Sequence, residues 1–116
     1  MPDVFEDLKQ RLNDFANERD WDQFHSPKNL VMALIVEAAE LVEQFQWLSQ
    51  EESRAITPEK KVEVEAELAD ILIYLVRIAD KLEVDLYQAA LSKLEKNSHK
   101  YPVEKVRGKS AKYTEY

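Results

Sequence analysis

Two pairs of acidic residues have the spacing of a possible metal site. Glu37 and Glu40 are three residues apart, and so are Glu67 and Asp70. On an α-helix, residues three apart lie on the same face, so each pair would present two carboxylates in one direction. Four converging carboxylates repel one another and lose hydration unless a cation lies among them. A hard divalent ion such as Mg²⁺ takes oxygen ligands and keeps positions for water and substrate phosphate.

The same spacing also fits two solvated acidic helix faces, because charged side chains are rarely buried. Two features favour the metal site over this alternative. Glu67 and Asp70 lie in very apolar surroundings, the stretch 68–76, and the acidic pattern occurs in two separate segments. Residue chemistry alone leaves both interpretations open.

The acidic pairs fall on two of four helices that local signals predict. These helices run from about 3 to 19, 27 to 49, 58 to 82 and 85 to 98. Ser26-Pro27 and Thr57-Pro58 each combine an N-cap residue with a proline at the first helical position. Asp85, followed three residues later by Gln88, predicts a capping box at the start of the last helix.

The segments that connect these helices are predicted to differ in how well they are packed. Residues 20–25 carry two aromatic side chains and predict a packed connection, whereas 50–56 is polar and predicts a loop. Pro102 is predicted to end regular structure. Residues 1–102 are therefore assigned to one helical domain, and 103–116 to a basic C-terminal tail.

Each acid-bearing helix also has an apolar stripe beside its acidic residues. The apolar stripes are Leu30, Leu34, Leu41 and Phe45 on the first of these helices, and Val64, Leu68, Ile71, Leu75 and Leu82 on the second. With about 100° of rotation per residue, each acidic stripe lies roughly 90° from its apolar neighbour. If the helices pack side by side, the four carboxylates can converge on one cleft.

The third predicted helix is apolar on nearly every side over 71–79, with Arg77 as the interruption. A helix that is buried all round in so short a chain implies partners. On the predicted helix 27–49, three further apolar residues also point away from the leucine stripe, namely Met32, Val36 and Ala39. We therefore expect an all-α bundle of about four helices per chain, assembled as a homo-oligomer. The alternative is a monomeric bundle with this helix at its centre.

Composition excludes several classes of protein. The chain has 116 residues, 45% of them apolar, and 16 basic against 23 acidic residues give a net charge of −7. One glycine, Gly108, and no cysteine exclude a glycine-cradled phosphate loop and a disulfide framework. The acidic balance disfavours a polymeric nucleic-acid partner. No run of residues is apolar enough for a membrane span, and the N-terminus lacks signal-peptide features, so we expect a cytoplasmic protein without a membrane partner.

The acidic pairs and their flanking segments resemble the MazG-type all-α nucleotide pyrophosphohydrolases, and within them the dCTP pyrophosphatase branch. The acidic motifs are Glu37-Ala-Ala-Glu40 and Glu67-Leu-Ala-Asp70, and the matching flanks are 18–25, 27–30, 45–47, 73–75, 84–86, 93–97 and 100–102. The resemblance covers residues 4–116. It implies a dimer of dimers that splits a nucleoside triphosphate, dCTP, into monophosphate and diphosphate. It further implies that the four acidic residues are catalytic and hold Mg²⁺.

Eight further positions that match the family's motifs are implied to contact the substrate. They are Trp21, His25, Trp47, Tyr74, Lys93, Asn97, Lys100 and Tyr101. The tryptophans would offer faces to the nucleobase with the histidine nearby, and the tyrosine hydroxyl would reach the sugar or phosphates. Lys93 and Asn97 would supply a charge and an amide. Each has a structural alternative, since tryptophans in small bundles are usually core residues, a histidine before a helix can help to cap it, and lysines are usually solvated.

The sequence departs from the family's pattern at three positions. Val36 and Ala39 stand where relatives often have glycine, and Leu12 stands where some relatives place a histidine. The departure at Leu12 leaves the preference for cytosine open. A broad-specificity house-cleaning (d)NTP pyrophosphatase is therefore an alternative function.

Two functions from other classes are weaker alternatives. A di-iron carboxylate bundle needs a histidine three residues after a glutamate, and neither His25 nor His99 has that position. A non-catalytic helical interaction module would show no metal-dependent activity. It would also tolerate Glu→Gln changes in the acidic stripes.

Overall fold

The computed structural model describes residues 3–110, which form helices and contain no strand. The helices are α1 (Val4–Glu18), the 3₁₀ helix η1 (Asp22–Phe24), α2 (Pro27–Glu43), α3 (Gln50–Ser53), α4 (Pro58–Lys81), α5 (Leu86–Lys100) and α6 (Val103–Val106). The all-α prediction is confirmed. The chain divides into two compact units, Met1–Val84 and Asp85–Tyr116, and each is described by itself. Among the described helices, no segment combines the length and the hydropathy of a membrane span.

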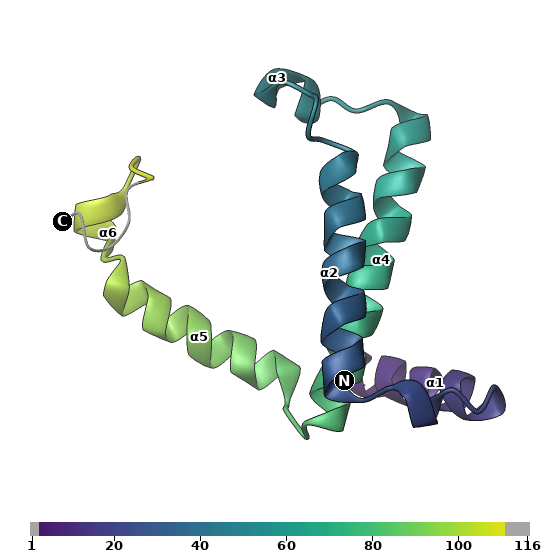
Figure 1. The fold of residues 1–116 in the computed structure, drawn as a ribbon. Coiled ribbons are helices and arrows are strands. Elements are labelled where there is room, and N and C mark those ends of the chain that lie inside the picture. Colours follow the sequence, from purple (N-terminus) through teal and green to yellow (C-terminus); the bar gives the residue numbers. More distant parts are fainter. Residues whose placement is uncertain (1–2, 111–116) are drawn as a thin grey trace. The chain divides into compact units, whose positions relative to one another are not determined.

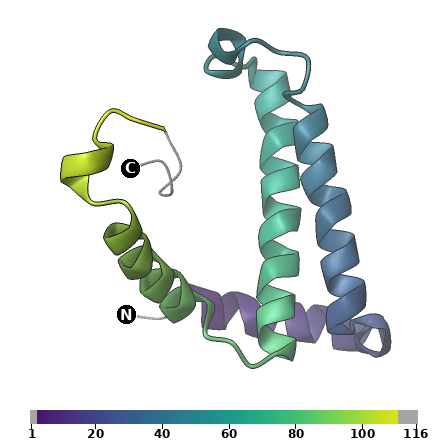
Figure 2. The same ribbon diagram turned by 60° about the vertical axis from the view of Figure 1, so that its left-hand side comes forward.

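In the first unit, α2 and α4 pack side by side as an antiparallel hairpin, and α1 crosses one end of it (Figures 1 and 2). α3 lies at the opposite end, in the connection between the two long helices. The buried apolar side chains come from all three longer helices, and they are Ala16, Leu30, Val64, Val76 and Ala79. This core is small, so much of the apolar surface of the hairpin stays uncovered within the unit.

The long helices begin at the predicted caps. The side-chain oxygen of Ser26 accepts the backbone N–H of Asn29 at 3.2 Å. The side-chain oxygen of Thr57 accepts that of Lys60 at the same distance. Both caps are followed by a proline at the first helical position, where its missing N–H would have no intrahelical partner. The carboxylate of Asp85 accepts the N–H of Gln88 at 3.0 Å and so starts α5.

The prediction for the region between α2 and α4 was wrong in two respects. α2 ends at Glu43 rather than near Ser49, and the polar segment after it contains the helix α3. Ser49 and Glu52 form a reciprocal capping box there, with bonds of 2.8 and 3.1 Å, which stabilises one isolated helical turn. At the end of α2, the ammonium group of Lys60 donates to the carbonyl oxygen of Gln44 at 2.9 Å and satisfies a terminal acceptor.

The periodicity of α4 also misplaced part of the core. Leu68, Leu75 and Leu82, which were assigned to the core stripe, are 51, 38 and 55% exposed, whereas Val76 and Ala79 are buried. α4 is apolar on more than one face, so its pattern alone cannot show which face meets α2.

In the second unit, α5 extends to Lys100, and α6 follows Pro102 directly. Regular structure therefore continues past the proline that was predicted to end it. Pro102 has a φ of −59° and precedes the first helical residue, a position where its fixed φ is compatible with a following helix. Residues 111–116 of the predicted basic tail lie outside the described residues.

Candidate metal centre and nucleotide site

Three half-buried carboxylates from α2 and α4 converge on one point. One oxygen each of Glu37, Glu67 and Asp70 lies within 4.8 Å of the other two. Glu40 is not part of this trio but is close enough to raise the pKa of Glu37. The packing of α2 against α4 thus brings the two acidic pairs together, as their positions beside the apolar stripes predict.

Two oxygen atoms in this cluster are buried without a donor. Oε2 of Glu37 and Oε2 of Glu67 have no hydrogen-bond partner among the described residues. An ionised carboxylate oxygen can only accept, so two buried oxygens without a donor in one acidic cluster call for a proton or a cation. An oxygen-only donor set with open acceptors fits a hard divalent ion such as Mg²⁺.

The raised pKa values of two carboxylates in the cluster also indicate that it favours an added positive charge. The pKa of Glu37 is raised to about 7, and the largest cause is a proton shared with Glu67. Burial, a hydrogen bond with Glu40 and the negative charges of Glu40 and Asp70 supply the rest of the increase. The shared proton favours the charged form of Glu67, but burial and the charges of Glu40 and Asp70 outweigh it, so the pKa of Glu67 is also raised. A bound cation would replace that proton, since metal ligands must be deprotonated.

Tyr74 lies one helical turn beyond Asp70 and is half-buried. Burial raises the pKa of Tyr74, and the negative charges of Glu37 and Asp70 add to the effect. The phenol therefore keeps its proton at neutral pH and can donate a hydrogen bond beside the carboxylates.

The two tryptophans present aromatic surface to solvent within the first unit. Trp21 packs edge-to-face on Phe15, with ring centroids 5.8 Å apart and an interplanar angle of 69°, and remains 46% exposed. Trp47 is 86% exposed and lies in the turn after α2 rather than on the helix, because that helix ends at Glu43. Neither is a core residue of the described unit.

His25 belongs to a polar cluster that the sequence did not predict. Nη2 of Arg77 lies 3.0 Å from Nδ1 of His25, and the same guanidinium group donates to Asn13 and Asp22. Hydrogen bonds from Lys81 and Arg77 hold the pKa of Asp22 below its ordinary value. In the sequence, Arg77 is visible only as a charge that interrupts an apolar stretch, and that interruption is the signal of its role.

The remaining predicted substrate residues lie in the second unit. Lys93 and Asn97 lie one turn apart on α5, Lys100 is its last residue, and Tyr101 caps it. Lys93 is exposed and Asn97 is half-buried. The carboxylate cluster belongs to the first unit, so a shared role of these residues with the carboxylates is part of the functional proposal.

Known proteins provide an independent identification. A model of the MazG-like family matches residues 32–116. The chain belongs to the MazG-like family. It is 47% identical over 114 residues to a bovine protein named dCTP pyrophosphatase 1, covering 97% of this chain and 68% of the relative. A human protein of the same name is 45% identical, with 97% and 67% covered. The crystal structure of a pyrophosphatase from Archaeoglobus fulgidus superposes with a TM-score of 0.82 at 41% identity, covering 88% of this chain and 95% of that one.

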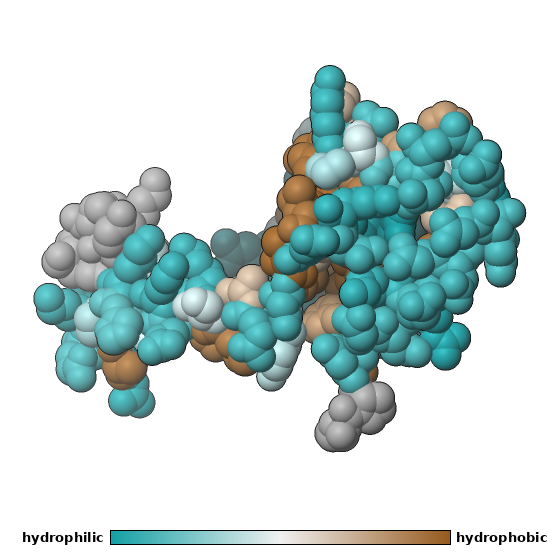
Figure 3. All heavy atoms as spheres, turned by 90° about the horizontal axis from the view of Figure 1, so that it is seen from below, coloured by the Kyte–Doolittle hydropathy of each residue, from teal (hydrophilic) through white to brown (hydrophobic). Residues whose placement is uncertain are grey.

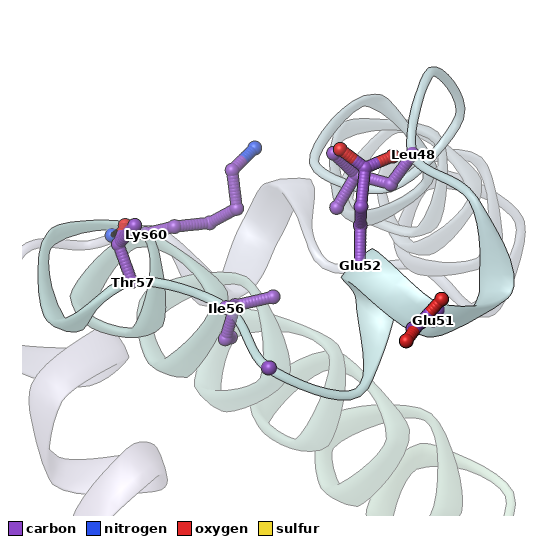
Figure 4. A pocket seen from close by; sticks show the side chains of 7 residues that line it. Leu48, Glu51, Glu52, Ile56, Thr57 and Lys60 are labelled. Atoms are coloured by element: carbon purple, nitrogen blue, oxygen red, sulfur yellow. Dashed lines mark hydrogen bonds between the residues drawn. The ribbon is translucent and has the colours of Figure 1, made fainter.

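The resemblance inferred from the acidic motifs is thereby confirmed. This MazG-like chain also has an open hollow of about 420 Å³, away from the carboxylates, between α3 and the start of α4. Lys60 and Glu52 lie on opposite sides of it (Figure 4). Its lining residues are Leu48, Glu51, Glu52, Ala55, Ile56, Thr57 and Lys60, and none of them is a predicted site residue.

Proposed function

We propose that this MazG-like chain hydrolyses dCTP to dCMP and diphosphate with Mg²⁺ held by Glu37, Glu40, Glu67 and Asp70. The observation that carries the proposal is the carboxylate cluster with its two buried, unpaired oxygen atoms. The relatives named dCTP pyrophosphatase 1, which match 97% of this chain, support dCTP as the substrate.

The four carboxylates have two tasks in this proposal. Bound Mg²⁺ would neutralise phosphate charge and lower the pKa of an attacking water. The protein supplies the convergence of two rigid helices, which holds the ligand oxygens in place before substrate arrives. One of the same carboxylates takes the proton that the water loses.

The other proposed site residues bind the nucleotide. Trp21 and Trp47 lie at opposite ends of the α2–α4 hairpin, so they would stack on one base only if they came from two copies of the chain. Stacking contributes about 1–3 kcal/mol per base irrespective of its identity. The hydroxyl group of Tyr74 donates to the sugar or a phosphate. His25 and Asn97 are the polar candidates for the base edge.

Three further residues complete this set at and just beyond the C-terminal half of α5. They are Lys93, Lys100 and Tyr101. The ammonium groups of the lysines would attract the triphosphate, because opposite charges favour its approach. The tyrosine would add a phenol group beside them.

A homotetramer is the proposed assembly, and the uncovered apolar surface supports it. Met32, Ile35 and Val36 on α2 are 57, 66 and 54% exposed, and Leu72 on α4 is 39% exposed. Brown apolar side chains form a strip along one side of the body that contains α2 and α4 (Figure 3). Contiguous apolar surface of this kind marks protein–protein contact. The cytoplasmic location and the absence of nucleic-acid and membrane partners remain predictions from composition.

A broad (d)NTP house-cleaning pyrophosphatase is the second candidate, and the aromatic surface favours it. Trp47 is 86% exposed, and stacking on such a face accepts any base. Initial rates on dCTP, dTTP, dATP, dGTP and the four NTPs with Mg²⁺ separate the candidates. We expect kcat/KM to be highest for dCTP. Equal values for all four dNTPs would favour the broad enzyme.

A further inference from the structure

Arg77 is a buried cation that joins three segments of the first unit. Its side chain is 3% exposed. Nη1 donates to Oδ1 of Asn13 on α1 at 2.5 Å, and Nη2 donates to Oδ1 of Asp22 on η1 at 3.0 Å. Lys81 reinforces the same carboxylate at 2.5 Å.

Burial of this charge leaves one of its donors unpaired. Nε of Arg77 has no hydrogen-bond partner in the described part of the chain. Oδ2 of Asp80 lies 3.9 Å from Nη1, beyond hydrogen-bond distance. A buried charge needs a close counter-ion and satisfied donors, and apolar side chains of similar volume are often as stable at such positions. The arrangement therefore suggests a role beyond stability.

The third contact of Arg77 determines the state of His25. Nη2 lies 3.0 Å from Nδ1 of the imidazole. A guanidinium group can only donate, so Nδ1 must accept, and the ring proton of neutral His25 lies on Nε2. Burial lowers the pKa of His25, and the positive charge of Arg77 lowers it further, which keeps the ring neutral.

We propose that Arg77 is a positioning residue for nucleobase recognition: it holds the segment 21–25 against α4 and fixes His25 as an Nε2–H donor. The inference rests on the proposed function, which assigns Trp21 and His25 to the base. The segment begins at Trp21, which Phe15 supports from α1, and ends at His25, which Arg77 orients from α4. A donor fixed in this way selects a hydrogen-bond acceptor on the base, such as a ring nitrogen or carbonyl oxygen of cytosine.

The first test reads the tautomer directly. The protein has two histidines, so ¹⁵N labelling of histidine and long-range ¹H–¹⁵N correlation spectra resolve both rings. We expect His25 of the wild-type protein to be neutral with its proton on Nε2, and His99, which is exposed on α5, serves as the internal reference. A proton on Nδ1 of His25 would overturn the proposal. This measurement needs no variant, so it decides even if substitutions at Arg77 prevent folding.

The second test separates binding from chemistry. Arg77→Lys keeps a cation near Asp22 but removes the planar guanidinium group, whose two terminal nitrogens contact Asn13 and His25 at the same time. We expect the His25 ring to show both tautomers and the KM for dCTP to rise about tenfold, with kcat within about twofold of wild type, since one oriented hydrogen bond is lost. Arg11→Lys is the control, because Arg11 is an exposed arginine that pairs only with Asp7 at 2.9 Å among the described residues, and we expect it to change neither quantity.

Two results would contradict the role of Arg77. One is an unchanged tautomer and KM in Arg77→Lys, and the other is a fall in kcat with KM unchanged. Both are distinct from a failure of the proposed function, which would appear as no hydrolysis of dCTP by the wild-type protein.

Discussion

At the scale of residues, the proposed metal site contains carboxylate oxygens that lack donors. Oε2 of Glu37 and Oε2 of Glu67 are buried without a hydrogen-bond partner among the described residues. Because the cluster consists only of acceptors, each ligand is needed for its charge as well as its position. This distinguishes the cluster from an acidic helix face, where one charge more or less has little effect.

Asp70→Asn tests that distinction with little change in size. We expect kcat to fall by about 100-fold or more while the far-UV circular dichroism spectrum stays the same, because one ligand charge is lost from the metal site. Glu65→Gln, at an exposed position of the same helix, is the matched control and should keep wild-type activity. Near-full activity of Asp70→Asn would remove Asp70 from the site.

The raised pKa of Glu37 predicts how the metal-free protein responds to pH. The folded state holds a proton on Glu37 up to about pH 7, whereas the unfolded chain releases it near 4.5. The folded state therefore binds the proton more tightly, and this contribution to stability is fully present below pH 4.5 and is lost as the pH rises through about 7.

Thermal unfolding in EDTA measures this effect. We expect the melting temperature of the wild-type protein, relative to Glu37→Gln, to fall between about pH 5 and about pH 8. Mg²⁺ should restore it at the higher pH, because the cation replaces the proton. Parallel pH profiles for the two proteins in EDTA would show that Glu37 does not carry the shared proton.

At the scale of elements, local signals located the helix starts more reliably than the helix ends. Thr57-Pro58 predicted the start of α4, because an N-cap oxygen and a proline act within one turn. At the end of α2, the carbonyl oxygen of Gln44 accepts a hydrogen bond from Lys60, which is sixteen residues away in sequence. A contact between distant residues leaves no local pattern, so the turn that carries Trp47 was mistaken for helix.

Local spacing also explains which parts of the candidate site could be predicted from the sequence. The acidic pairs, with spacing of three, were evident because the helical repeat places each pair on one face. The contacts of Arg77 with Asn13 and His25 span 64 and 52 residues of sequence, and only the packing of α1, η1 and α4 brings them together.

The N-cap of α4 provides a test at this scale. Thr57→Ala should lower the free energy of unfolding by about 1 kcal/mol, because the backbone N–H of Lys60 loses its acceptor. Denaturation by urea measures the change. Thr57→Ser, which keeps the hydroxyl group, is the control and should stay close to wild type. A loss of equal size in both variants would assign the effect to the methyl group instead.

At the scale of the whole molecule, the proposed tetramer would cover apolar surface that the small core of the first unit leaves exposed. Ile35→Asp places a charge on the exposed apolar face of α2, where Ile35 is 66% exposed. We expect this variant to sediment as a smaller species than wild type, because an unpaired charge in an interface costs several kcal/mol.

The wild-type protein should sediment well above the 13.6 kDa of one chain. Asn17→Asp adds the same charge at an exposed position of α1 and should not alter the sedimentation coefficient. A wild-type protein that sediments as an active monomer would contradict the proposed tetramer.

The identity of the products formed from dCTP tests the proposed reaction. Chromatography that resolves dCMP, dCDP, phosphate and diphosphate, after incubation of the protein with dCTP and Mg²⁺, shows which bond breaks. We expect equal amounts of dCMP and diphosphate, no product in EDTA, and recovery when Mg²⁺ is added back. Formation of dCDP and phosphate, or undiminished hydrolysis in EDTA, would contradict it.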